Sequence, residues 1–328
     1  MKFKGLLIGA LLVLIVSVCY ATKKEEIAFV SGDLRLSGTV MLPKGKGPFP
    51  AVVFLHGSGE STRDQNIWRA KKFVKNGYIA LVYDKRGTGE SQGTKDDWRY
   101  FSFDSLAQDA IAAIDYLKTR SDVKAQKIGI VAASQSGWVA PIVANKSNDV
   151  SFLIMISASV STVAEDRLFE RATRLANEGF NKMEVAEATE MQKLDQELTR
   201  NHSRHEEFKQ LWEKNKNKAW FSRVYVSEYF LEEPSSNAYR SWFKTLIDFD
   251  PVPLLEATNI PILWLFGDSQ LDRFGPVEQS LKRINMLVDS GKNFQSIQYP
   301  GSDHNLKGTD YFSDIFSWLQ ASANSDQR

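Results

Sequence analysis

The sequence is nearly without cysteine, since Cys19 is the single one among 328 residues, and it holds only four histidines. A chain with one cysteine cannot form an intramolecular disulfide, and it lacks the thiolate clusters that bind structural zinc. Net charge is also nearly absent, at +1 from 41 basic and 40 acidic side chains. Strong positive charge favours binding to nucleic acids and anionic membranes. We therefore expect neither as a partner.

The N-terminus is typical of an export signal. Lys2 and Lys4 precede an apolar run from Gly5 to Val18, and small residues follow, ending at Ala21. The run is short for a membrane span, and a basic, then apolar, then small-residue order is typical of secretory signal peptides. We expect residues 1–21 to be a cleaved signal peptide and the protein to be periplasmic or secreted. The alternative is an uncleaved N-terminal anchor.

Strand-like and helix-like segments alternate over most of the remaining chain. Residues 25–43 predict an antiparallel hairpin, and short apolar runs then alternate with amphipathic stretches. This alternation predicts an α/β fold with a mostly parallel sheet covered on both faces. Residues 161–250 differ, because they are rich in helix formers and carry aromatic residues that line a cleft or pack inside. We expect a core of residues 22–160 and 251–328 with a helical cap inserted at 161–250.

Ser134 ends a buried apolar strand and is followed at once by a helix-like segment. A serine at such a junction is held in a strained turn that lifts its hydroxyl above the sheet. The usual pattern is G-x-S-x-G, whereas this chain has Ala132-x-Ser134-x-Ser136, with Gly137 one place late. A polar turn after a strand is the competing interpretation.

A serine nucleophile needs a general base, usually a histidine, that is oriented by a carboxylate. Candidates stand at the ends of successive predicted strands, in the order Ser134, Asp272, His304. This order is the one found in the α/β-hydrolase architecture. Parallel-sheet proteins place their active sites outside the carboxyl ends of the strands.

The chain resembles the α/β-hydrolases over residues 25–160 and 250–320, and among them bacterial exported serine hydrolases with a helical cap. Each motif that carries the resemblance is common alone, but their joint order and spacing are specific. The motifs are His56-Gly57-Ser58-Gly59, Asp84-x-Arg86-Gly87-x-Gly89-x-Ser91, the Ser134 turn and Pro300-Gly301-x-Asp303-His304.

The resemblance implies a role for each matching residue. Ser134 is expected to be the nucleophile, and His304 the general base that later protonates the leaving group. Aligning the family's acid on Asp-Arg-x-x-Pro selects Asp272, and Asp268 is the alternative. The backbone N–H groups of Ser58 and Gln135 are expected to form the oxyanion hole.

The remaining patterns favour simpler interpretations. Gly87 and Gly89 do not fit a dinucleotide fingerprint, because the third glycine comes one place late and no helix opens there. Asp84 and Arg86 are expected to brace their loop. His202 and His205, three residues apart on a predicted helix, lack further ligands nearby, so a solvated pair is favoured over a metal site.

We therefore expect a serine hydrolase that cleaves carboxylic esters through an acyl-enzyme on Ser134, without cofactor or metal. A peptidase or amidase is the main alternative, because the same triad cleaves either bond. A non-catalytic binding protein on the same scaffold is a further one. The expected partner is a small-molecule ester or a short peptide, with no nucleic acid and no stable membrane partner beyond the N-terminal anchor.

Overall fold

The computed structural model describes residues 23–225 and 228–325, so the predicted signal peptide lies outside the described residues. An eight-stranded sheet forms the centre, with strand order β1-β2-β4-β3-β5-β6-β7-β8. The strands are β1 (Lys23–Ser31), β2 (Leu34–Leu42), β3 (Phe49–Phe54), β4 (Ile79–Tyr83), β5 (Val123–Ala133), β6 (Val150–Ile156), β7 (Ile262–Phe266) and β8 (Phe294–Gln298).

The predicted hairpin and the predicted parallel sheet are both confirmed. Strands β1 and β2 pair antiparallel around Gly32, whose φ of +58° is the left-handed backbone that glycine adopts readily. Strand β2 pairs antiparallel with β4, and every later pair from β3 to β8 is parallel. The sheet is therefore mostly parallel with one antiparallel edge, as the predicted α/β fold requires.

Helices cover both faces of the sheet because alternate residues of each buried strand pack on opposite sides. Val53 and Ile130 face the core cluster that contains α3, α4, α10 and α11, whereas Val52 and Val131 face α1 and α12. The helices of the core are α1 (Asp64–Lys75), α2 (Lys95–Arg99), α3 (Phe103–Lys118), α4 (Ser136–Lys146), α10 (Val252–Ala257), α11 (Val277–Asp289) and α12 (Tyr311–Ser325).

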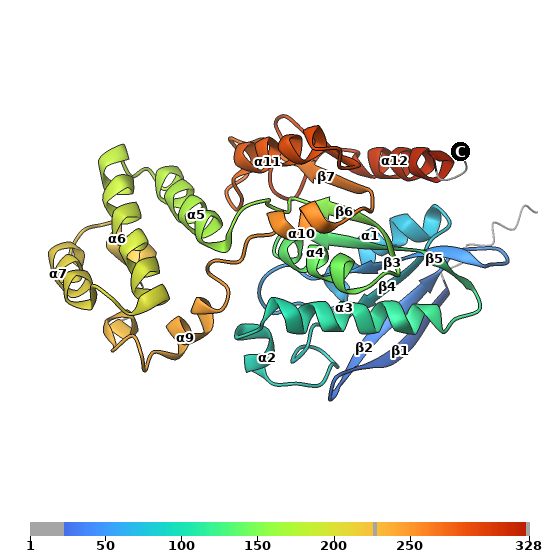
Figure 1. The fold of residues 1–328 in the computed structure, drawn as a ribbon, viewed down its shortest axis with the longest axis horizontal. Coiled ribbons are helices and arrows are strands. Elements are labelled where there is room, and N and C mark those ends of the chain that lie inside the picture. The colour runs from blue at the N-terminus through green and yellow to red at the C-terminus, as the bar shows by residue number, and fades with distance from the viewer. Residues whose placement is uncertain (1–22, 226–227, 326–328) are drawn as a thin grey trace, which may run out of the picture.

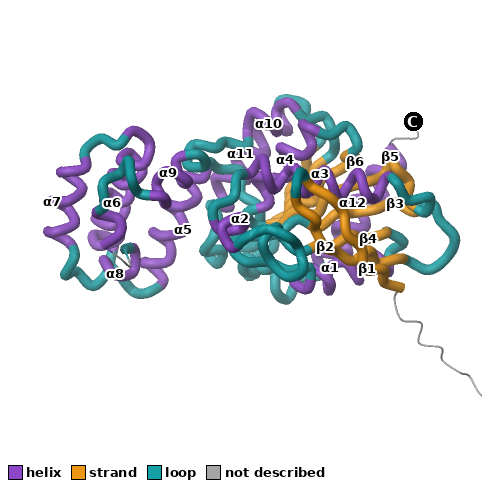
Figure 2. Tube along the Cα trace, turned by 90° about the horizontal axis from the view of Figure 1, so that it is seen from below, coloured by secondary structure: helices purple, strands orange, loops and turns teal. Residues whose placement is uncertain are grey.

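The remaining helices lie between β6 and β7 in the chain and stand to one side of the sheet in both views (Figures 1 and 2). They are α5 (Val163–Asn177), α6 (Lys182–Asn201), α7 (His205–Asn215), α8 (Phe221–Val224), the 3-10 turn Glu228–Leu231 and α9 (Ala238–Lys244). No helix within the described residues combines the length and apolarity needed to cross a bilayer.

These helices have a hydrophobic core of their own. Trp212, Trp220 and Tyr225 are buried in it. Beneath them, the wholly buried guanidinium of Arg240 lies 2.5 Å from the Asp195 carboxylate. Phe243 instead packs against the core of the sheet. The aromatic residues of this segment thus mainly fill interior space.

Candidate active site

Ser134 occupies the turn between β5 and α4 with a φ of +55°. Left-handed backbone is costly for a residue with a Cβ, so this conformation is held by its surroundings. The Ser134 N–H donates to the carbonyl oxygen of Ile156, on β6, at 3.0 Å. The side chain therefore leaves the end of the sheet at the position that a nucleophile requires.

The close approach in this turn occurs at Gly137, which explains why glycine comes one place late. A Cβ added to Gly137 would lie 2.6 Å from the Cβ of Ala158, a distance that real side chains do not tolerate. Ser136 has room for its side chain, whose Oγ accepts from Ala133 N at 2.7 Å and donates to Ala133 O at 2.9 Å. The relaxed motif thus builds the same turn.

His304 pairs with Asp272. Its Nδ1 lies 2.9 Å from Oδ2 and 3.0 Å from Oδ1 of that carboxylate, which is 1% exposed. The carboxylate also accepts from Phe274 N at 2.9 Å. A carboxylate facing Nδ1 keeps the proton there and leaves Nε2 free to act as a base.

Asp268, the alternative acid, has a different role. Its carboxylate accepts from Gly301 N at 2.8 Å and Gln270 N at 2.9 Å, and these backbone hydrogen bonds hold its pKa below the ordinary value. It therefore ties the loop after β7 to the loop after β8. The structure places Asp272, and not Asp268, against His304.

Two further contacts hold His304, one to its backbone and one to its ring. The hydroxyl of Ser157, at the end of β6, donates to the His304 carbonyl oxygen at 2.6 Å. The ring of Phe274 lies 5.0 Å from the imidazole, centroid to centroid. Both contacts fix the loop that carries the base.

A cavity of about 150 Å³ brings four of the five predicted site residues together. Its lining residues are Ser58, Ser134, Gln135, Trp138, Ser157, Ser159, Asp166, Arg167, Glu170, Phe274 and His304. The fifth, Asp272, lies behind His304. Ser134 and His304 face this space without a hydrogen bond between them in the described part of the chain, a contact that commonly tightens only when substrate is bound.

Sequence reasoning missed one wall of this cavity, which α5 supplies. Asp166 is buried there, and burial raises its pKa to about 6 although the Ser159 hydroxyl and Arg167 oppose the shift. Arg167 pairs with Glu170 at 3.1 Å. In the sequence, the charged residues of this segment have the pattern of a solvated helix face. Only the packing of α5 beside the sheet shows that Asp166, Arg167 and Glu170 line the cavity instead.

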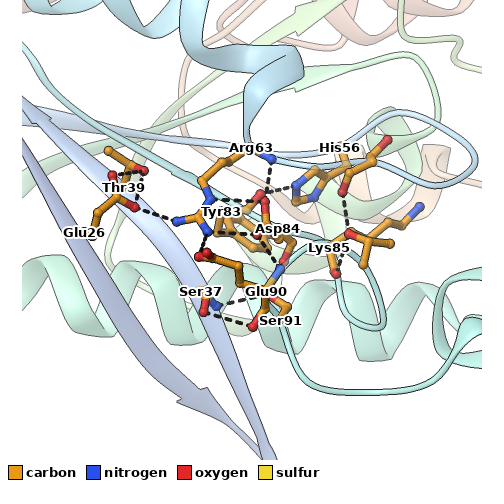
Figure 3. A network of polar contacts seen from close by, with 12 residues as sticks. Glu26, Ser37, Thr39, His56, Arg63, Tyr83, Asp84, Lys85, Glu90 and Ser91 are labelled. Atoms are coloured by element: carbon orange, nitrogen blue, oxygen red, sulfur yellow. Dashed lines mark hydrogen bonds and ion pairs between the residues drawn. The ribbon is translucent and has the colours of Figure 1, made fainter.

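His56 is excluded as the base. Its Nε2 lies 2.6 Å from the Tyr83 carbonyl oxygen, to which it donates (Figure 3). Burial, with a smaller effect of the Lys85 charge, lowers the pKa of His56 to about 4. A histidine that stays neutral and bonds to the backbone is part of the scaffold.

The Asp84 motif braces its loop, as its sequence predicts. The Asp84 carboxylate accepts from Arg63 N at 2.8 Å and Glu90 N at 2.9 Å (Figure 3). The Arg86 guanidinium pairs at 2.7 Å with the buried carboxylate of Asp109, on α3.

His202 and His205 do not share a helix face, and the favoured solvated pair is confirmed for His202 alone, because the His205 side chain is only 11% exposed. Helix α6 ends at Asn201, His202 has a φ of +57°, and α7 begins at His205. The chain turns at this point, and His205 Nε2 lies 3.2 Å from the Leu231 carbonyl oxygen. No group of His, Cys, Asp and Glu side chains in the described residues has the arrangement of a metal site.

Comparison with known proteins identifies relatives of this chain. Residues 31–251 match the family model described as X-Pro dipeptidyl-peptidase (S15 family). Esterase EstD of Thermotoga maritima is 27% identical over 242 residues, which are 71% of this chain and 49% of that protein. The bifunctional esterase/perhydrolase DCH of Acinetobacter calcoaceticus is 27% identical over 270 residues, 80% of this chain and 87% of that protein. The chain thus spans about half the length of EstD.

Solved structures share the fold. An esterase of Pyrococcus furiosus has a TM-score of 0.60 at 15% identity, covering 92% of this chain and 91% of the other. An acylaminoacyl peptidase of Pyrococcus horikoshii has a TM-score of 0.55 at 17% identity, covering 89% of this chain and 39% of the other. The fold is thus shared with solved esterases and peptidases. Since the family model matches more than half of the residues, the chain belongs to the X-Pro dipeptidyl-peptidase (S15) family.

Proposed function

We propose that the protein hydrolyses carboxylic esters through an acyl-enzyme on Ser134. One observation carries the proposal: a serine in a left-handed turn and a histidine paired with a buried carboxylate line the same cavity. That is the arrangement that nucleophilic acyl transfer requires.

In the proposed reaction, His304 Nε2 takes the proton of Ser134 as its Oγ attacks the acyl carbon. Asp272 stabilises the imidazolium that forms. The N–H groups of Ser58 and Gln135 stabilise the oxyanion of the tetrahedral intermediate. Collapse expels the alcohol, which takes the proton from His304. A water molecule then attacks the acyl-enzyme, with His304 as its base, and releases the acid and free Ser134.

The names of EstD and DCH support an ester as the scissile bond. A peptide bond is the second candidate, because the family description and the acylaminoacyl peptidase structure name peptidases. One observation favours it as well: Asp166 brings a buried carboxylate into the cavity. Such a group suits the ammonium of a peptide N-terminus better than it suits a neutral ester.

Two further expectations belong to this proposal. The order of charge and apolarity in residues 1–21 supports export and removal of the segment. The separate hydrophobic core of α5 to α8 supports treating residues 161–250 as a cap that selects the substrate. Mass spectrometry of the protein recovered from the periplasm would test export, since an intact N-terminus would contradict cleavage.

Kinetics on the purified protein tests the reaction. We expect turnover of p-nitrophenyl esters, a preference among graded acyl chains and slower cleavage of aminoacyl-nitroanilides. Faster cleavage of the anilides would favour the peptidase. Ser134→Ala should remove activity and labelling by a fluorophosphonate while the circular dichroism spectrum stays unchanged. A Ser134→Ala variant with wild-type turnover would overturn the mechanism.

A further inference from the structure

The ammonium group of Lys85 lies buried directly behind the proposed oxyanion hole. Lys85 is 1% exposed, and its Nζ lies 3.2 Å from each of three acceptors: the carbonyl oxygens of Gly57 and Gly59 and the Oε1 of Gln135. The ring of Phe101 closes another side, with its centroid 5.2 Å from Nζ. Three N–H donors thus meet three acceptors away from solvent.

The contact with Gly57 fixes the direction of the Ser58 N–H. The peptide bond between these residues is trans, so its carbonyl and N–H point in opposite directions. With the Gly57 oxygen turned toward Lys85, the Ser58 N–H points away from the ammonium. Ser58 lines the active-site cavity, so its N–H lies on the cavity side of this loop, where substrate would bind.

The contact with Gln135 ties the same ammonium to the second proposed donor. Gln135 follows Ser134, and its side chain is bound by Lys85. Its backbone N–H donates to no backbone carbonyl in the described residues. The two segments lie against each other, since a Cβ added to Gly57 would be 3.9 Å from the Cβ of Ser134. One cation therefore joins the loop after β3 to the turn after β5.

We infer that Lys85 is a positioning residue that sets the oxyanion hole by fixing the backbone of Ser58 and the side chain of Gln135, without contact with substrate. This inference rests on the proposed function of Ser134. Preorganised donors stabilise an oxyanion because they need not reorient during the reaction. Removing the tether lowers the rate of the chemical step more than it changes ground-state binding.

The protonation state of Lys85 can be followed through the pH dependence of the reaction. Burial lowers the pKa of Lys85 to about 8, and the nearby Asp109 charge opposes this shift. Asp109 is itself paired with Arg86, and His56 is neutral in this range. Above pH 8 the amine keeps two N–H donors for three acceptors, so the tether weakens.

The test compares Lys85→Met with Lys292→Met. Lys292 also donates to a backbone carbonyl, Thr258 O at 3.0 Å. It precedes β8, at the amino ends of the parallel strands, whereas Ser134 follows β5 at their carboxyl ends. We expect kcat of Lys85→Met on a p-nitrophenyl ester to fall by about 10- to 100-fold, with KM within about threefold of wild type. Lys292→Met should keep both constants. A Lys85→Met kcat within about threefold of wild type would overturn the inference.

A second measurement is the pH profile of kcat, which tests the inference on the wild-type protein even if Lys85→Met does not fold. The wild-type kcat should fall as the pH rises through about 8, because Lys85 then loses a donor. In Lys85→Met this fall should be absent, and a flat wild-type profile between pH 7 and 10 would overturn the inference. Wild-type protein that cleaves no ester or anilide and takes up no fluorophosphonate would instead refute the proposed function.

Discussion

Asp272 and Asp268 lie four residues apart in one loop, yet their carboxylates contact different neighbours. The Asp272 carboxylate is buried and binds the imidazole of His304, whereas that of Asp268 binds backbone N–H groups. A carboxylate that faces Nδ1 sets the tautomer of the base, and a carboxylate that holds a loop does not.

The pair of aspartates therefore offers a matched test. We expect Asp272→Asn to lower kcat by about 10⁴-fold, because an amide leaves the imidazole in the wrong tautomer. Asp268→Asn should keep kcat near wild type and cost some thermal stability through weaker loop hydrogen bonds. Steady-state kinetics and thermal unfolding of both variants check this. Equal losses of kcat in the two variants would contradict the assignment.

At this scale the sequence predicts most of the site. Chain order and motifs select Ser134 and His304, because few serines and histidines follow a strand in these contexts. They do not decide between Asp272 and Asp268 as the triad acid. Both follow β7, and the path of the loop, which the sequence does not give, determines which of them reaches His304. Lys85 has no signal of its own, because a lysine between Asp84 and Arg86 resembles a surface residue until β4 buries it.

Among the elements, the turn between β5 and α4 depends on contact with the residues after β6. Gly137→Ala would place a methyl group 2.6 Å from the Ala158 Cβ. We expect this overpacking to cost about 1–3 kcal/mol of unfolding free energy and to lower kcat by shifting Ser134. A second substitution, Ala158→Gly, removes the methyl group with which the new side chain would clash. It should restore part of the unfolding free energy and part of kcat. Additive effects in the double variant would contradict direct contact.

Helix α5, which carries one wall of the cavity, is joined to α11 through Glu165. Its carboxylate lies 2.8 Å from both terminal nitrogens of Arg283. Burial opposes ionisation, but the hydrogen bonds from Arg283 and Thr162 outweigh it and lower the pKa of Glu165 to about 2. The charged form is thus the one that holds the two helices together.

The sign of the pH effect follows from that shift. A carboxyl with a lowered pKa stabilises the fold above its ordinary pKa of 4.5, and this stabilisation is lost as the pH falls toward 2. Glu165→Gln should therefore lower the melting temperature at pH 7, and the difference from wild type should shrink below pH 4.5. Differential scanning calorimetry across this range checks it. A difference that stays constant with pH would contradict the ion pair.

Element prediction succeeds where periodicity is strong. In helix α3 the buried residues Leu106, Ala110 and Ile114 recur four apart, the spacing from which the sequence predicts a helix over residues 103–118. Asn76 and Gly77 likewise predict the end of α1, which the structure places at Lys75. It fails at His202, where the segment as a whole is rich in helix formers but the backbone turns left-handed after Asn201. The weak helix formers Asn201, His202 and Ser203 are the local signal for this helix end.

For the whole molecule, stability in acid depends on His56. Its pKa of about 4 lies below the ordinary 6.5, so the unfolded chain takes up a proton in this interval that the folded protein does not. The unfolding free energy should fall as the pH drops from 6.5 to 4, by about 3 kcal/mol at most.

His56→Gln removes the titration and keeps a side-chain donor for the Tyr83 carbonyl oxygen. We expect this variant to be less stable than wild type at pH 7 and to lose less stability on acidification. Urea unfolding at pH 7 and pH 4.5 measures both. A parallel loss of stability in the two proteins would contradict the role of His56.

The strand order of the sheet is beyond sequence reasoning. Strands β3 to β7 each carry a run of buried apolar residues, so the pattern of each allows any neighbour. Chain order does not predict the place of β4 between β2 and β3, whereas β5 to β8 follow one another in the sheet as they do in the chain. Long-range packing decides the place of β4.

Strands β6 and β7 are hydrogen-bonded neighbours, although the chain makes the whole excursion through α5 to α9 between them. The two ends of that excursion are therefore fixed side by side whatever lies in the middle, and the entropic cost of a longer loop grows only slowly with its length. Evolution can exchange or enlarge this segment while the strands that carry Ser134 and His304 keep their register. Under the proposed function, exchange of this segment would alter substrate selection while Ser134 and His304 stay in place.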